Sequence, residues 1–238
     1  MRTELRRNIS LRVLLILVLT VSLLLATGFA TSLNGLAAWG SRFVKTHGID
    51  PRQGAETRYQ LDATKSTFMV RAFSGGLLWF KGHDHFIAVR DFTGEVKLTP
   101  LSISPASLQM TIKSDSLVET RDVFTEPQKQ IINKEIKEIV LHTAQYPEIT
   151  FKSTNVTGKL ASAGQFEAKI EGDLTMHGVT RRIVIPAQVT LLANDLRAKG
   201  EFTVARSDFK VKATSAFHGT VRVRDKLKFT FDILAHSY

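Results

Sequence analysis

The feature that most constrains the fold of this chain is a strict alternation of apolar and charged residues. Between Phe166 and Leu174 every second residue is apolar or glycine. The residues between them are all charged: Glu167, Lys169, Glu171 and Asp173. In a β-strand successive side chains point to opposite faces, so this segment has one apolar and one charged face. The alternation predicts a strand that buries one face only.

The same period recurs along most of the chain. Long alternating runs cover residues 183–191, 196–204 and 227–233, and shorter ones cover 68–72, 86–98, 108–113 and 149–151. Strands with one apolar face are antiparallel as a rule, and a sheet with one apolar face must cover it. Closing the sheet on itself covers that face and also removes the strand edges. We therefore predict an all-β fold, an eight-stranded antiparallel barrel.

One helix is expected between the strands. Thr125 is a suitable N-cap, Pro127 falls in the first turn, and Gln128 completes a capping box. Apolar residues then follow at helical spacing: Ile132, Ile136, Ile139 and Val140. The helix has two possible places, as a lid over one barrel mouth or packed on the outside of the barrel.

The N-terminus has the layout of a targeting segment. Three arginines come first: Arg6, Arg7 and Arg12. An apolar stretch at 13–25 and small residues at Ala26, Gly28 and Ala30 follow, as in a secretory signal. No charged residue occurs between Val13 and Ser41, which at about 1.5 Å per residue is also enough to span a bilayer of about 30 Å.

These signals divide the chain into three parts. Residues 1–41 are a signal sequence or a transmembrane anchor, 42–57 form a linker, and 58–238 form the barrel. Because the basic flank precedes the apolar stretch, the N-terminal end should stay in the cytoplasm and the barrel should be exported. We expect the barrel in the periplasm or at the outer face of the inner membrane, with the inner membrane as a partner of the N-terminal segment.

Composition excludes several classes of function. The chain contains no cysteine, so disulfides, thiolate metal sites and cysteine nucleophiles are excluded. The net charge is +10, but lysines and arginines alternate with apolar residues along strands and form no basic run with interleaved aromatics. This pattern indicates a solvated barrel exterior, and no nucleic-acid partner is expected.

No catalytic constellation stands out. The only histidine cluster is His83-Asp84-His85, whose two histidines share a face if the segment is extended. With His177 or His218 as a third ligand they could hold a metal at the barrel mouth, but two histidines are not a full ligand set. The simpler interpretation is a polar cluster at the rim. We predict no enzyme activity, catalytic residue, metal or cofactor, and keep a metal-dependent or enzymatic site at His83 and His85 as the alternative.

The expected interior combines large and small apolar residues. An eight-stranded barrel is wide enough to be filled by side chains or to hold one slim ligand. The chain has 15 phenylalanines, and small residues interleaved with them would leave space. We therefore predict a site for a long apolar ligand, with a self-filled core as the alternative. The predicted ligand-binding residues are Phe68, Val70, Phe86, Ala88, Phe166, Ile170, Gly172, Ala198, Phe202, Phe229 and Phe231.

Two motifs also resemble a known family. Residues 146–154 (YPEITFKST) are similar to the YPxIxFxS signature of the YceI-like, polyisoprenoid-binding family, and residues 172–180 (GDLTMHGVT) are similar to its GxLTxHGVT hairpin. A third similarity lies at 114–122, whereas 72–85 departs from the family pattern. The resemblance implies a lipocalin-like barrel that encloses a long isoprenoid chain, in an exported bacterial protein without an assigned enzyme activity. We therefore expect a carrier or storage protein for an isoprenoid or another lipid.

Overall fold

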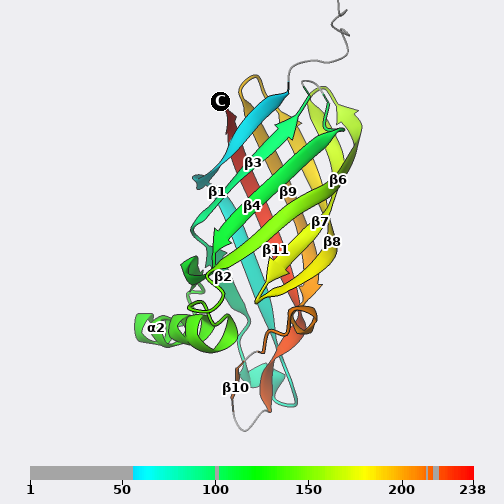
Figure 1. Ribbon diagram of the computed structural model, residues 1–238. Coiled ribbons are helices and arrows are strands. Elements are labelled where there is room, and N and C mark those ends of the chain that lie inside the picture. The colour runs from blue at the N-terminus through cyan, green and yellow to red at the C-terminus, as the bar shows by residue number, and fades with distance from the viewer. Residues whose placement is uncertain (1–55, 100–101, 213, 217–219) are drawn as a thin grey trace, which may run out of the picture. The chain divides into compact units, whose positions relative to one another are not determined.

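A computed structural model describes residues 56–99, 102–212, 214–216 and 220–238 (Figure 1). The predicted signal or anchor segment lies outside these residues, as does the predicted linker except for its last two positions. Within the described ranges, no helix combines the length and apolar character needed to cross a membrane.

The described residues are mostly strand. The strands are β1 (Thr57–Gly75), β2 (His85–Val89), β3 (Phe92–Leu98), β4 (Ala106–Lys113), β5 (Leu117–Glu119), β6 (Glu148–Ser162), β7 (Gln165–Met176), β8 (Val179–Leu191), β9 (Asp195–Ala205), β10 (Ser215–Ala216) and β11 (Val221–Ser237). Helical segments are η1 (Trp79–Lys81), η2 (Ser114–Ser116), α2 (Glu126–Glu135), the π-helical η3 (Ile136–Val140) and η4 (Arg206–Phe209).

Eight of these strands close into a ring. Each strand pairs with the next in the order β1-β3-β4-β6-β7-β8-β9-β11, and β11 pairs back onto β1 through registers such as Phe68 opposite Phe231. All of these pairs are antiparallel. The predicted eight-stranded antiparallel barrel is confirmed, and Figure 1 shows the strands wrapping around it.

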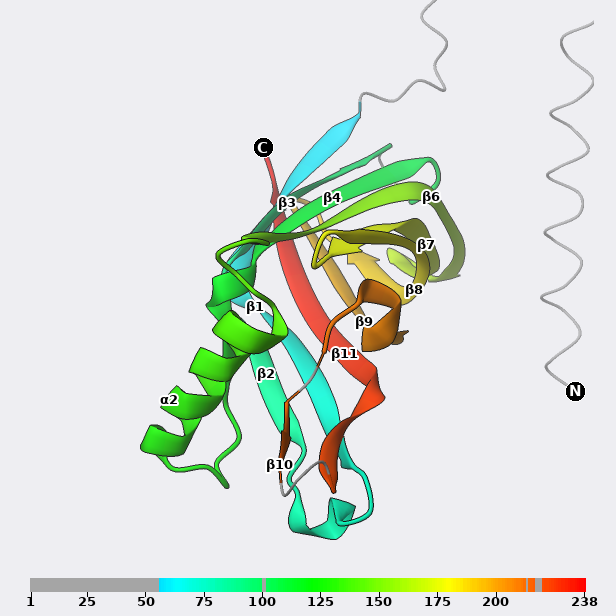
Figure 2. The ribbon, with the colours of Figure 1, turned by 60° about the horizontal axis from the view of Figure 1, so that its bottom comes forward.

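The remaining three strands branch from the ring at one end. The first residues of β1 pair with β3, whereas Met69 to Ala72 pair with β2, which in turn pairs with β5. At the same end β10 pairs with the beginning of β11. Figures 1 and 2 place α2 at this end of the barrel as well, so β2, β5, β10 and α2 together surround one mouth.

The alternation seen in the sequence gives the two faces of the sheet. In β7 the side chains of Phe166, Ala168 and Ile170 are buried, and the charged residues between them are exposed or half-buried. Charged residues on the outer face form ion pairs, such as Arg182 with Asp173 at 2.8 Å. The β7–β8 turn consists of His177 and Gly178 with φ values of 53° and 71°, the conformation that a two-residue hairpin favours.

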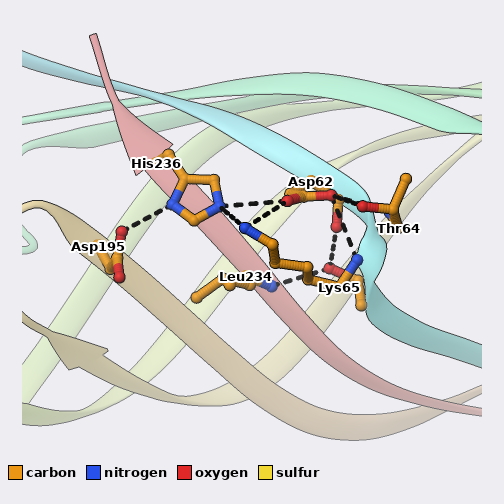
Figure 3. A network of polar contacts seen from close by, with 7 residues as sticks. Asp62, Thr64, Lys65, Asp195, Leu234 and His236 are labelled. Carbon is orange, nitrogen blue, oxygen red and sulfur yellow. Dashed lines mark hydrogen bonds and ion pairs between the residues drawn. The ribbon is translucent and has the colours of Figure 1, made fainter.

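The seam between β1 and β11 contains a polar network (Figure 3). The register shifts after Asp62, and the Asp62 carboxylate accepts hydrogen bonds from the backbone N–H groups of Thr64 and Lys65 at 2.9 and 3.2 Å. The ring nitrogens of His236 on β11 lie 2.7 Å from Asp195 Oδ1 and 3.2 Å from Asp62 Oδ2. His236 therefore connects β1, β11 and β9 at the end of the barrel remote from α2.

Candidate ligand-binding interior

The barrel interior contains two apolar cavities. The lid cavity, of about 170 Å³, lies against Ile132, Ile136 and Val140 of α2 and η3. The barrel cavity, of about 130 Å³, lies deeper in the ring and is lined by residues such as Ile170 and Ala198. The interior is therefore not a completely filled core.

A constriction separates the two cavities. Four side chains line both of them and form what we call the waist: Phe68, Ile112, Leu174 and Phe202. The Phe202 ring stacks on Phe229 with centroids 4.8 Å apart, and the Phe68 ring lies 6.2 Å from that of Phe229. A ligand that occupied both cavities would have to pass these aromatic rings.

Seven of the eleven predicted ligand-binding residues line a cavity. They are Phe68, Val70, Phe202 and Phe229 in the lid cavity, and Phe68, Ile170, Ala198, Phe202 and Phe231 in the barrel cavity. Phe166 is buried in the core but lines neither cavity. Whether these residues contact a ligand stays a prediction.

Phe86 and Ala88 lie on the opposite face of β2 from the one we expected. Alternate residues of this strand, His85, Ile87 and Val89, line the lid cavity instead. The guanidinium of Arg71 lies over the Phe86 ring, with Cζ of Arg71 5.4 Å from the ring centroid. We expected the even-numbered residues of β2 to face the barrel interior. This expectation was wrong because the irregular segment between β1 and β2 breaks the alternation of inward and outward side chains.

Gly172 does not leave space for a ligand. A Cβ at this position would lie within 2.7 Å of the Phe151 ring and 2.6 Å of the Lys152 carbonyl oxygen. The glycine instead makes room for Phe151, which itself lines the barrel cavity. Ala198 differs, because its own side chain forms part of the cavity wall.

The helix lies at one mouth of the barrel and lines the lid cavity, which favours the lid among the two places left open by the sequence. The predicted capping box is present, with the Thr125 N–H donating to Gln128 Oε1 at 2.8 Å. The apolar residues Ile132, Ile136 and Val140 line the lid cavity. Ile139, expected on the same face, is 52% exposed. Asn133 connects the helix to β5, because its Oδ1 accepts a hydrogen bond from the backbone N–H of Glu119 at 2.7 Å.

Among the described residues, the charged side chains that line the two cavities all lie at the lid end. The lid cavity has four polar lining residues, His85, Glu135, Arg206 and Thr214, whereas Ser107 is the single polar residue lining the barrel cavity. We did not anticipate Arg206 or Glu135 from the sequence, since neither belongs to a motif. Any chemistry with charged groups is therefore confined to this mouth.

Glu119 is a buried carboxylate beside that mouth. It accepts hydrogen bonds from His85 Nδ1 and from the backbone N–H of Arg121, both at 2.8 Å, and from the N–H of Phe86 at 3.2 Å. Burial raises the pKa of Glu119, but these hydrogen bonds outweigh burial and hold the pKa below its ordinary value. The pair of His85 and Glu119 spans two strands, so no local signal could have predicted it.

The structure gives the histidine cluster a packing role. The rings of His83 and His85 both contact Phe124, with centroids 5.8 and 5.3 Å away. His177, a candidate third metal ligand, instead lies 3.4 Å from His142, and His218 is outside the described residues. In the part of the chain that is described, no three His, Asp or Glu side chains are grouped to hold a metal.

The family-like motifs meet in space. The Tyr146 ring covers Gly178, where a Cβ would lie 2.7 Å from its Cε1, and it contacts His177 at a centroid distance of 4.4 Å. The hydroxyl of Ser114, a residue of the third motif, donates to the Tyr146 carbonyl oxygen at 2.6 Å. The three motifs therefore hold β4, β6 and the β7–β8 hairpin together next to the lid.

A closed antiparallel barrel with an apolar interior and a helical lid defines the class of lipocalin-like folds. The chain belongs to the family of the YceI-like domain, whose model matches residues 59–235. It is 30% identical over 135 residues to a UPF0312 protein of Vibrio cholerae and 32% identical over 129 residues to one of Pseudomonas syringae pv. tomato. These matches cover 57% and 52% of this chain but only 59% and 62% of the relatives.

Two solved structures share the fold. Burkholderia cenocepacia BcnA is 21% identical with a TM-score of 0.56, and the alignment covers 73% of this chain and 98% of BcnA. A polyisoprenoid binding domain from Saccharophagus degradans, described as implicated in plant cell wall breakdown, is 15% identical with a TM-score of 0.53. That alignment covers 76% of this chain and 98% of the domain.

Proposed function

We propose that the barrel binds a long apolar ligand, a polyisoprenoid or another lipid, as an exported carrier or storage protein. The observation that carries this proposal is the pair of apolar cavities inside a closed barrel. Covering apolar surface contributes about 25 cal/mol per Å², so a chain that filled both cavities could bind tightly without a specific polar contact. The solved polyisoprenoid binding domain supports the proposal because it shares this fold.

Binding without catalysis is the activity that fits the interior best. A catalytic site needs convergent polar groups with perturbed pKa values inside a cavity. Among the described residues, Ser107 is the single polar side chain of the barrel cavity. The lid cavity has four polar lining residues, but the alternative, a metal-dependent or enzymatic site at His83 and His85, requires further ligands, and among the described residues no three His, Asp or Glu side chains are grouped to hold a metal.

Filling the barrel cavity tests the proposal. Ala198→Phe places an aromatic ring in the cavity wall, and Thr203→Phe adds the same ring on the exposed face of the same strand as a control. We expect mass spectrometry of organic extracts to find a co-purified lipid in the parent and in Thr203→Phe but not in Ala198→Phe. Overpacking should lower the stability of Ala198→Phe by about 1–3 kcal/mol without unfolding it. A parent that carries no lipid and takes up none in vitro would contradict the proposal.

Export is proposed from the N-terminal sequence alone. The arginines precede the apolar stretch, so the C-terminal barrel should reach the outer side of the inner membrane. A reporter that is active only after export, fused after Tyr238, should be active. Activity of a reporter that works only in the cytoplasm would refute this location.

A further inference from the structure

Arg206 brings a positive charge to the wall of the lid cavity. It is the first residue of η4, directly after β9. Its two terminal nitrogens donate to backbone carbonyl oxygens, Nη1 to Val211 at 2.9 Å and Nη2 to Val223 at 3.4 Å. These bonds anchor the guanidinium between the segment that follows η4 and strand β11. Its Nε is buried and has no hydrogen-bond partner among the described residues.

Arg206 forms no ion pair with the described carboxylates around the mouth. Within the described ranges no carboxylate oxygen lies within 4.0 Å of its guanidinium. Asp225 accepts hydrogen bonds from the hydroxyl and the backbone N–H of Ser207 at 2.8 and 3.0 Å, and these bonds, with a smaller contribution from the charge of Arg206, lower the pKa of Asp225. Glu119 is engaged by His85, and Glu135 lines the same cavity from the lid without an ion pair to Arg206.

The buried Nε is out of reach of a ligand, but each Nη nitrogen carries a second N–H besides the one that it donates to a carbonyl oxygen, so the guanidinium keeps donors for a further acceptor. The remaining surroundings favour an anion as the partner. Thr214 contributes a hydroxyl to the cavity wall. Lys210 and Lys212, in the segment that follows η4, are exposed, and no described carboxylate pairs with either of them. Their charge adds to the positive potential at this mouth.

We propose that Arg206 binds the acidic head group of a lipid whose apolar chain lies in the lid cavity. This inference rests on the proposed function and names the class of ligand, a long apolar chain that ends in a carboxylate or a phosphate. Guanidinium groups form strong, charge-assisted hydrogen bonds with both anions. The apolar walls hold the chain, and Arg206 selects an acid over the matching alcohol.

Paired ligands test this selection. The probes are geranylgeranyl phosphate against geranylgeraniol, and palmitic acid against hexadecanol, with affinities measured by fluorescence displacement. We expect the parent to prefer the acid of at least one pair, and the pair with the larger preference identifies phosphate or carboxylate. Arg206→Gln should weaken binding of that acid about tenfold or more and change binding of the alcohol less than about twofold.

Three further variants separate head-group binding from a structural role. Arg224→Gln removes the same charge one residue from the cavity-lining Val223, where the Arg224 side chain bonds to the Ser74 carbonyl oxygen. Arg224→Gln should leave the ratio of the affinities for the acid and the alcohol unchanged. Arg206→Lys should keep the preference for the acid. Glu135→Gln, on the half-buried lid, removes a negative charge from the cavity and should strengthen binding of the acid alone.

The outcomes are distinct. Equal affinity of the parent for acid and alcohol would overturn the inference while leaving the proposed function intact. Arg206→Gln could also weaken the binding of acid and alcohol equally while Glu135→Gln leaves the binding of the acid unchanged. That result would assign Arg206 a purely structural role and would also overturn the inference. Failure of the parent to bind any of the four probes would remove the proposed function, and this inference with it.

Discussion

His236 is the residue whose protonation bears most directly on closure of the barrel. Its ring is hydrogen-bonded to Asp195 on β9 and Asp62 on β1, and these two carboxylates raise the pKa of His236. Lys65, whose Nζ lies 3.4 Å from Nε2 of the ring, opposes them in part. Both ring nitrogens can donate to a carboxylate only when the imidazole is charged. Protonation therefore strengthens the connection between β1, β11 and β9.

This raised pKa predicts a stability that depends on pH. The contribution of His236 should be complete below its unfolded pKa of about 6.5 and should be lost as the pH rises through the higher folded value. His236→Gln should flatten this part of the profile, whereas His83→Gln, outside the seam, should retain it. Urea unfolding followed by circular dichroism across this range measures the effect. Identical profiles for the parent and His236→Gln would show that the network does not contribute.

Single residues also show where sequence patterns stop being informative. Seven of the predicted interior residues line a cavity because parity is preserved within an unbroken strand. Parity is not carried across a loop, and for this reason Phe86 and Ala88 were assigned to the wrong face. Gly172 was misinterpreted because its space is filled by Phe151 from the neighbouring strand. The position of that ring depends on a strand register that no local pattern specifies.

At the scale of elements, the lid is held by few contacts. Asn133 connects α2 to β5 through one hydrogen bond to Glu119, and no residue of α2 or η3 is fully buried. Such weakly packed elements are the ones that open most readily. The capping box and helical spacing predicted that this helix exists, but its place over the mouth depends on a contact between distant segments.

Asn133→Ala should loosen the lid. The substitution leaves the backbone N–H of Glu119 without its acceptor and should cost about 1–3 kcal/mol. We expect faster hydrogen exchange in α2 and η3 and faster dissociation of a bound lipid, with little change in the barrel strands. Gln130→Ala, at an exposed position of the same helix, is the control. Equal exchange rates in both variants would mean that Asn133 does not restrain the lid.

At the scale of the barrel, the waist divides the interior. Phe68 lines both cavities and contacts three other aromatic rings, those of Phe92, Phe229 and Phe231. Its ring is one of the four side chains that separate the two cavities. If the rings do not move, a ligand is limited to the length of one cavity.

Phe68→Ala should join the two cavities. Loss of a buried phenylalanine typically costs about 3–5 kcal/mol, which urea unfolding would measure. If the waist limits ligand length, the variant should bind longer prenyl alcohols relative to short ones than the parent does. Ile87→Ala, which enlarges the lid cavity away from the waist, is the matched control. An unchanged length preference in Phe68→Ala would show that the waist already opens in the parent.

The pairing of β1 with β11 has a consequence for how the chain is made. Tyr59 lies opposite Ser237, so the first and last strands of the barrel are neighbours although almost the whole domain separates them in sequence. Contacts between such distant residues form slowly, because a long loop must be ordered before they are gained. Of the barrel strands β11 leaves the ribosome last, and until it does β1 and β9 each lack one neighbour. The nascent chain must therefore avoid edge-to-edge aggregation until β11 has emerged.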